Sequence, residues 1–250
     1  MSIPASSQHS GPSLRAIDPW VRGKPSKGTQ HQLLSEDEKA RLATLASIVR
    51  FKKNERIYRE GESADMVFNI ISGVVGLYKQ RSETDRHIVA FVSAEDIFGL
   101  AEEGQYVNSA TALTSVIAYC LPVPALRRLL LNDAGLDLHI IAKLCQELRQ
   151  AQRQALIIAQ KQATPRLAMF LSLQEHLQSS RNELATEIYL PMNRSAIAEY
   201  IGLSLAAVSR AFKVLVDTGV ISYRDRHHIK VGDRRAFDKL AKFPIEEIAE

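Results

Sequence analysis

The sequence is poor in cysteine. Its 250 residues include only Cys120 and Cys145, each among apolar neighbours and far from the other along the chain. Two cysteines exclude a disulfide scaffold, a zinc ribbon and a cluster held by four thiolates of one chain. The apolar neighbours predict burial of both. A redox-sensing thiol, with Cys145 as the candidate, and a metal site shared by two chains are the alternatives.

Long apolar runs are also absent. No run approaches the roughly 18 residues of a membrane span. The first twenty residues lack the basic segment followed by an apolar core that marks a signal peptide. These two absences exclude a membrane partner and make the cytoplasm the expected location. Hydrophobic residues make up 46% and charged residues 24% of the chain, which is typical of globular domains.

Catalytic motifs are missing as well. The sequence contains no nucleophile–base pair, no metal-ligand cluster and no phosphate-binding loop. The carboxylates of "EDEKARL" and "AEEGQ" have the pattern of a solvated surface. We therefore expect that the protein is not an enzyme and holds no metal.

Positive charge, by contrast, is concentrated near the C-terminus. Between Asn193 and Arg235 there are eight Arg or Lys residues against four Asp or Glu residues, with His227 and His228 in addition. The net charge of the whole chain is only +4. Clustering of this kind predicts a surface that contacts the phosphates of a nucleic acid.

Four segments follow one another along the chain. Residues 1–30 are rich in Ser, Pro, Gly and Gln, which predicts a disordered arm. Residues 31–134 begin with a short helix after Ser35 and continue with β-rich pieces about ten residues apart, which predicts an antiparallel barrel or jelly roll. Residues 135–162 predict a long helix, and residues 163–250 a C-terminal domain. The expected fold class is therefore α+β.

The long helix carries a heptad repeat of apolar residues. The repeat comprises Ile141, Leu144, Leu148, Ala151, Ala155 and Ile158. Alternating spacings of three and four residues are typical of a coiled-coil seam. We predict a homodimer through this seam; packing on the helix's own domain is the alternative. Thr164-Pro165 breaks the repeat, and Pro165 can begin the next helix.

Residues 194–215 predict two helices joined by a tight turn. Gly202 can adopt a positive φ in the turn, and Ser204 is a suitable N-cap for the second helix. The pieces "VISY" and "HIKV" predict two strands around the basic turn Arg224–Arg226. Helix, turn, helix and β-wing in this order predict a winged helix-turn-helix. An ordinary helical subdomain is the alternative.

The second of these helices is the predicted DNA-contacting element. The residues predicted to contact bases are Leu205, Ala206, Ser209 and Arg210. Those predicted to contact the DNA backbone are Asn193, Arg194, Ser204, Ala207, Lys213, Arg224, Arg226 and His227. Arginine is suited to a bidentate contact with guanine O6 and N7, whereas phosphate contacts position a protein without specifying sequence. A plain phosphate contact is the alternative for Arg210.

The order of these parts resembles the CRP/FNR transcription regulators. The resemblance runs from about His31 to Leu240, and it is carried by "IYREGESADMVFNIISGVVGLYK", "EDIFG", "LPMNRSAIAEYIGLS" and "VSR". It implies a cyclic-nucleotide-binding-like jelly roll, a long dimerisation helix and a C-terminal winged helix-turn-helix. It also implies a homodimeric activator that binds a palindrome in double-stranded DNA, with RNA polymerase as a partner.

The positions that bind cyclic AMP in relatives differ here. Those relatives have a Glu soon after the "FG" turn and an Arg-Ser pair for the cyclic phosphate. This chain has Gly99-Leu100-Ala101 after the turn and Asn108-Ser109 in place of the pair. A phosphate site without a guanidinium loses its main charge-assisted contact. We therefore expect no dependence on cyclic AMP.

Other cofactors of the family also lack their residues. Carbon-monoxide-sensing relatives place haem ligands where this chain has Gly99 and Ala101, which leaves His87 and His139 as candidates. The N-terminal arm has no cysteine for an iron–sulfur cluster. The resemblance thus favours a FixK-like regulator without a cofactor, controlled by its abundance or by thiol oxidation. A haem- or nucleotide-dependent regulator and a ligand-binding module that does not contact DNA are the alternatives.

One position of the recognition helix departs from the FNR branch. Helices of that branch usually carry a Glu three residues before the Ser-Arg pair, whereas this chain has Ala206 before Ser209-Arg210. The resemblance implies a half-site related to TTGAT. It also implies relaxed preference at the base pair that the Glu would contact.

Overall fold

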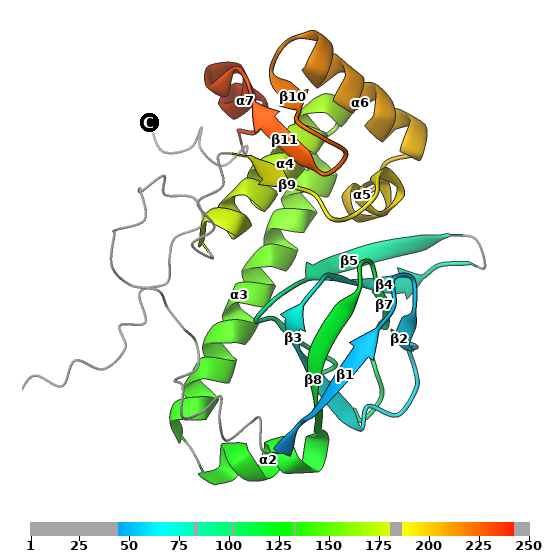
Figure 1. Cartoon of the computed structure of the whole chain (residues 1–250), viewed down its shortest axis with the longest axis vertical. Coiled ribbons are helices and arrows are strands. Elements are labelled where there is room, and N and C mark those ends of the chain that lie inside the picture. Colours follow the sequence, from blue (N-terminus) through cyan, green and yellow to red (C-terminus); the bar gives the residue numbers. More distant parts are fainter. Residues whose placement is uncertain (1–44, 83–84, 102, 133, 181–186, 243–250) are drawn as a thin grey trace, which may run out of the picture.

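The computed structural model describes residues 45–82, 85–101, 103–132, 134–180 and 187–242. Within them, a β-domain lies beside one long helix, and a smaller domain of helices with its own sheet lies at that helix's far end (Figure 1). The predicted α+β class is confirmed. The predicted arm of residues 1–30 and the helix expected after Ser35 lie outside the described residues.

The β-domain consists of two four-stranded antiparallel sheets, as the sequence predicts. Their strand orders are β1-β8-β3-β6 and β2-β7-β4-β5. The strands are β1 (Ser47–Phe51), β2 (Arg56–Tyr58), β3 (Met66–Ser72), β4 (Val75–Gln80), β5 (Arg86–Val92), β6 (Ile97–Phe98), β7 (Ser109–Ala112) and β8 (Val116–Pro122). Gly73, with a φ of 94°, makes the tight turn from β3 to β4, where an added Cβ would lie 2.2 Å from the Ser115 carbonyl oxygen.

The helices and the second sheet follow. The helices are α2 (Val123–Asn132), α3 (Ala134–Ala159), α4 (Ala163–Ser180), α5 (Arg194–Ile201), α6 (Leu205–Asp217) and α7 (Arg234–Leu240). The strands are β9 (Ile188–Tyr189), β10 (Ile221–Tyr223) and β11 (His228–Val231), in the antiparallel order β10-β11-β9. The two wing strands therefore lie where the sequence predicts them, and β9 adds a third.

The long helix ends earlier than predicted. It stops at Ala159 instead of residue 162, and α4 begins at Ala163 with Pro165 in its first turn, where a missing N–H costs no helical hydrogen bond. The Arg166 side chain forms hydrogen bonds across the break. It donates from Nε to the Gln160 carbonyl at 2.7 Å and from a terminal nitrogen to the carbonyls of Ile201 and Gly202 at 3.2 and 3.1 Å. One guanidinium thus joins the end of α3 to the end of α5.

A single hydrophobic core joins the β-domain to the C-terminal domain. It includes Tyr78 and Ile88 of the β4–β5 pair, Ile157 of α3 and Tyr200 of α5. The rings of Phe91 and Tyr200 stack with centroids 4.9 Å apart. Because apolar area removed from water stabilises by about 25 cal/mol per Å², this shared core fixes the position of α5 against the β-domain.

Polar bonds reinforce the same contact. Arg86 of β5 forms an ion pair with Glu199 of α5 at 2.7 Å. The buried Gln154 of α3 donates from its side-chain nitrogen to two carbonyl oxygens, that of Ile88 at 2.8 Å and that of Tyr200 at 3.0 Å. Gln154 thus satisfies one backbone acceptor in each domain, and all three elements meet at one amide group.

Replacing Gln154 is expected to loosen this junction. In a Gln154→Ala variant both carbonyls lose their donor, and each buried unsatisfied acceptor costs about 1–3 kcal/mol. We expect the free energy of unfolding, measured by urea denaturation, to fall by about 2–4 kcal/mol. The exposed Gln152 of the same helix provides the matched control, Gln152→Ala, which should change it by less than about 0.5 kcal/mol. Equal effects of the two substitutions would contradict the assigned role.

Candidate nucleic-acid interface

Two capped helices and a left-handed glycine build the centre of the site. The Asn193 side chain accepts a hydrogen bond from the Ala196 N–H at 2.8 Å and caps α5. Gly202, with φ 66° and ψ 41°, ends α5, and Ser204 caps α6 by accepting from the Ala207 N–H at 3.1 Å. The predicted positive φ of Gly202 and the predicted cap at Ser204 are therefore confirmed.

The caps leave donors on the outer side. Asn193 caps through its carbonyl oxygen and Ser204 through a lone pair of its hydroxyl, so the Asn193 NH₂ and the Ser204 O–H can still donate. The first-turn amides of Leu205 and Ala206 have no partner within the helix, as helix geometry requires. The Ala207 amide is already bonded to Ser204. The backbone contact predicted for Ala207 would therefore have to use another atom.

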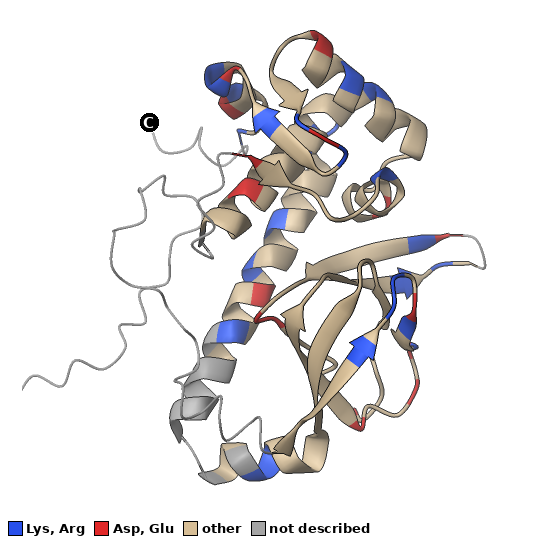
Figure 2. Ribbon diagram, viewed as in Figure 1, with Lys and Arg blue, Asp and Glu red and all other residues tan. Residues whose placement is uncertain are grey.

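Helix α6 divides into a buried and an exposed side. The buried side consists of Val208, Ala211, Phe212 and Leu215. Leu205, Ala206, Arg210 and Lys213 are exposed and Ser209 is half-buried. The basic positions of α6 are coloured blue along the ribbon in Figure 2. The residues predicted to contact bases thus share one open face. Lys213 pairs with Asp217 at 2.8 Å. Exposed pairs of this kind contribute only about 0.3–0.5 kcal/mol, so Lys213 can exchange Asp217 for a phosphate.

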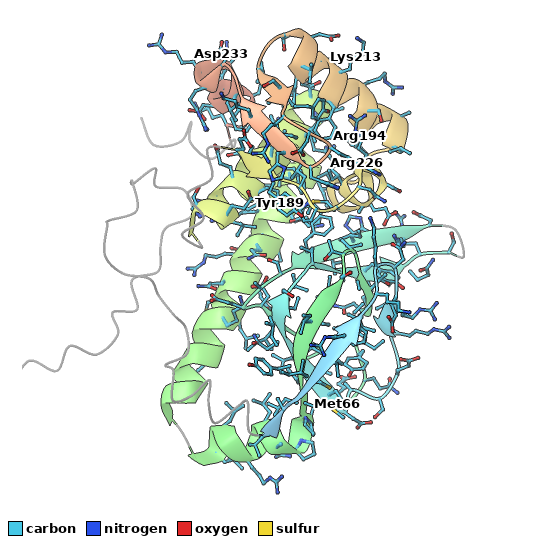
Figure 3. The ribbon with its side chains drawn as sticks, in the orientation of Figure 1. Met66, Tyr189, Arg194, Lys213, Arg226 and Asp233 are labelled. Carbon is cyan, nitrogen blue, oxygen red and sulfur yellow. The ribbon has the colours of Figure 1, made fainter. Side chains whose placement is uncertain are left out.

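Arg194 is held where α5, α6 and the wing meet (Figure 3). Its guanidinium carbon lies 5.0 Å from the centroid of the Phe212 ring and 5.9 Å from that of Tyr223. A terminal nitrogen donates to the Tyr223 hydroxyl oxygen at 2.9 Å. Burial raises the pKa of Tyr223, which the neighbouring Arg194 partly offsets, so the hydroxyl keeps its proton. The sequence analysis missed Tyr223; an aromatic residue directly before the basic turn was the available signal.

Asp225 organises the turn of the wing. Its carboxylate accepts hydrogen bonds from the backbone N–H groups of His227 and His228 at 2.8 and 3.0 Å and lies 2.9 Å from the His228 Nδ1. These bonds, that of the His227 amide first, hold the pKa of Asp225 well below its usual range. An acidic residue in the middle of a basic turn therefore shapes the loop.

The basic residues of the wing differ in the ion pairs and hydrogen bonds that they form within the domain. Arg224 pairs with Glu187 at 2.8 Å and with Asp225 at 3.3 Å. The His227 Nδ1 lies 2.9 Å from the Leu190 carbonyl oxygen, which ties the ring to the domain. Arg226 is exposed. Among the wing residues predicted to contact the DNA backbone, Arg226 is thus best placed to bind a phosphate without first losing an interaction within the protein.

Aromatic side chains fill the interior of the β-domain. The rings of Tyr58 and Tyr106 stack at 3.7 Å, and Phe68 and Phe98 stack at 5.1 Å. Asn108 and Ser109, which the resemblance places in the position of the Arg-Ser pair, are engaged within the domain. Asn108 Oδ1 accepts from the Tyr58 hydroxyl at 3.4 Å, and Ser109 Oγ accepts from the Glu60 N–H at 3.0 Å. These residues do not fit a cyclic nucleotide, because neither supplies a positive charge.

Helix α3 places charged groups against the β-domain. The buried Lys143 forms an ion pair with the buried Asp96. Burial raises the pKa of the nearby Glu147 to about 7, against the lowering effect of Lys143. Of the haem-ligand candidates, His87 lines a groove of about 330 Å³ between β5 and the α5–α6 turn, and nothing is described of the side chain of His139. Among the described residues no group of three His, Cys, Asp or Glu is placed to hold a metal ion.

The opposite face of α3 carries the heptad seam. Ile141, Leu144, Leu148, Ala151 and Ala155 are exposed, and Ile158 is half-buried. The alternative that this seam packs on its own domain is therefore wrong for the five exposed residues.

No helix in the described part of the chain is long and apolar enough to span a bilayer.

The two cysteines differ in their surroundings. Cys120 is buried in β8, as predicted, and burial raises the pKa of its thiol. Cys145 is exposed, so the prediction that it is buried is wrong. The apolar neighbours that suggested a core position, Leu144 and Leu148, themselves lie on the open face of α3.

Comparison with known proteins matches both halves of the chain. Residues 48–133 match the family described as "Cyclic nucleotide-binding domain", and residues 165–240 match the "Crp-like helix-turn-helix domain". These ranges correspond to the β-domain with α2 and to the segment from α4 to α7.

Relatives extend the match over most of the chain. The nitrogen fixation regulation protein FixK of Azorhizobium caulinodans is 31% identical over 216 residues, which cover 83% of this chain and 86% of that protein. The transcriptional activatory protein AadR of Rhodopseudomonas palustris is 29% identical over 198 residues, 79% of this chain and 82% of its own length. The structure of FixK2 from Bradyrhizobium japonicum superposes with a TM-score of 0.72 at 29% identity and covers 79% of this chain and 98% of that one.

Proposed function

Because the chain belongs to the CRP/FNR family of transcription regulators, we propose that it is a FixK-like activator that binds a palindromic DNA site as a homodimer. The observation that carries this proposal is the capped helix α6. It presents Arg210 and the amides of Leu205 and Ala206 on an open face beside a basic wing. In such domains the N-terminal residues of the second helix enter the major groove and contact base edges.

The homodimer is supported by the exposed seam of α3. Leucines left in water at heptad spacing are stabilised when a second copy of the helix covers them. A two-fold axis along the seam relates two α6 helices and therefore requires a DNA site with matching two-fold symmetry. We propose that the bound dimer activates transcription through a contact with RNA polymerase. In this proposal the protein is a regulator and not an enzyme, and it acts in the cytoplasm.

The proposal includes no bound effector. The inward-bonded Asn108 and Ser109 and the stacked aromatic interior support independence from cyclic AMP. The protein would then be controlled by its amount or by oxidation of a thiol. Two alternatives, a haem- or nucleotide-dependent regulator and a ligand-binding module that does not bind DNA, predict different results in the first experiment below.

Selection from a random pool of duplex DNA tests the proposal directly. We expect an inverted repeat with half-sites related to TTGAT, unchanged by cyclic AMP or haemin. Binding should weaken with salt at a log–log slope of about −0.9 for each phosphate contact. An Arg210→Ala variant should lose about 1–3 kcal/mol of discrimination at one base pair of each half-site. A slope near zero would show that the protein does not bind DNA through phosphate contacts and would contradict the proposal. DNA binding that requires haemin or cyclic AMP would favour the effector-dependent alternative.

An Ala206→Glu variant tests the register of the recognition helix in the same selection. The introduced carboxylate can accept a hydrogen bond from a cytosine N4. We expect sharpened preference at one base pair per half-site and an otherwise unchanged motif. The same motif from Ala206→Glu and wild type would show that residue 206 does not face the bases.

The dimer is tested by placing a charge in the seam. Leu148 is 60% exposed in the single chain, and a Leu148→Glu variant should sediment as a monomer because two carboxylates would face each other in the coiled coil. Leu131 of α2, 78% exposed but outside the seam, gives the control Leu131→Glu, which should remain a dimer. A dimeric Leu148→Glu protein would place the interface elsewhere.

Exposure of Cys145 makes the thiol proposal testable. Peroxide should weaken DNA binding of wild type and leave Cys145→Ser unaffected, because oxidation adds a polar or bulky group directly beside Leu144 in the seam. Binding is measured by fluorescence anisotropy before and after treatment, with reductant added back at the end. An equal response of both proteins would contradict the role of Cys145.

A further inference from the structure

Tyr223 is not among the residues predicted to contact DNA. It is the last residue of β10, directly before the basic turn of the wing, and 42% of its surface is exposed. It contacts residues of two other elements, Arg194 at the start of α5 and Phe212 in α6, whose ring centroid lies 6.2 Å from its own. One side chain of the wing is thus fastened to both helices of the helix-turn-helix.

The contact holds Arg194 in one position. Its guanidinium lies over the buried Phe212 ring and beside the Tyr223 ring. A free arginine side chain loses rotamer entropy when it is immobilised. Stacking on aromatic faces is a geometry that guanidinium favours. Arg194 is therefore ordered before any ligand arrives, and binding of an anion needs to order less.

The direction of the hydrogen bond leaves donors facing outward. Arg194 donates to the Tyr223 oxygen at 2.9 Å, so the proton of the tyrosine hydroxyl is directed elsewhere. A guanidinium has five N–H donors, and this bond uses one of them. The pair therefore offers a positive charge, several N–H groups and one O–H group at a single exposed point.

We propose that Arg194 and Tyr223 together bind one DNA phosphate in each half-site, with Tyr223 both holding the guanidinium and donating its own hydroxyl proton to the phosphate. This inference rests on the proposed function. Phe212 lies on the inner side of the recognition helix that carries Ser209 and Arg210. The same contact therefore sets the distance between a fixed phosphate and the base-contacting face. Tyr223 is in this sense a positioning residue.

A double-mutant cycle on the full-length dimer tests the pair. The variants are Tyr223→Phe, Arg194→Ala and the double substitution, each assayed on the selected palindrome and on an unrelated duplex. We expect Tyr223→Phe to raise the dissociation constant about tenfold on both duplexes, since both protomers lose a charge-assisted bond and phosphate contacts do not depend on sequence. In the Arg194→Ala background the same change should have less than about a twofold effect.

The salt dependence separates charge from geometry. Arg194→Ala should reduce the magnitude of the log–log slope by about two per dimer, one phosphate contact in each protomer. Arg194→Lys keeps the charge but loses the planar stacked group. It should therefore keep the slope while weakening binding. Tyr223→Phe should have a smaller effect in this background than in wild type, because it then removes the hydroxyl's own bond to the phosphate but no contact that holds the guanidinium.

The matched control is Tyr189→Phe. Tyr189 is 41% exposed and lies in β9, at the other edge of the same three-stranded sheet (Figure 3). In the described part of the chain its ring lies against those of His227 and His228 rather than against an arginine. Its loss of a hydroxyl should leave the dissociation constant unchanged.

Three results overturn the proposal. Tyr223→Phe could leave affinity unchanged. It could weaken binding equally in the wild-type and the Arg194→Ala backgrounds and also lower the thermal midpoint. That result would show that Tyr223 only stabilises the wing. Wild-type protein that shows no salt-dependent binding to duplex DNA would overturn both this inference and the proposed function, whereas normal wild-type binding without coupling overturns this inference alone.

Discussion

The side-chain amide of Gln154 is the interaction on which the arrangement of the molecule depends. It donates to a carbonyl of β5 and to a carbonyl of α5 from a position near the C-terminal end of α3. A buried amide that satisfies two backbone acceptors is hard to replace by water or by another side chain, because both acceptors are enclosed by the shared apolar core. The β-domain, the long helix and the helix-turn-helix therefore form one mechanical unit, and the orientation of α6 follows from the position of α3.

In the proposed DNA-binding surface, several side chains serve both the fold and the proposed contact with DNA. Asn193 and Ser204 cap helices with their acceptors and keep their donors free. Arg194 packs on aromatic rings and still carries its charge outward. Asp225 accepts hydrogen bonds from the backbone of the wing turn and thereby fixes the loop that carries Arg226. Preorganised donors of this kind lose little entropy on binding.

Local rules in the sequence predicted much of this. A glycine before a serine and an apolar run defined the turn and the cap, and ten-residue β periodicity defined the sheets. Long-range contacts were beyond such rules. The contact of Arg166 with the Gln160 carbonyl just after α3 and with the Ile201 carbonyl of α5 joins residues far apart in the chain. Cys145 was expected inside because its neighbours are apolar, although those neighbours lie on the exposed face of α3 that we propose for the dimer. Tyr223 was missed because its partners lie in two other elements.

The length of α3 has a geometric consequence. Its 26 residues span about 39 Å at 1.5 Å per residue. A rod of that length works as a lever: a tilt of about 5° at one end displaces the other by about 3.4 Å, which is the spacing of one base-pair step along a DNA strand. Since α5 and α6 are fastened to the end of this rod through Arg166 and Gln154, a change of a few degrees in the angle between two copies of α3 is enough to move the recognition helices out of step with the half-sites.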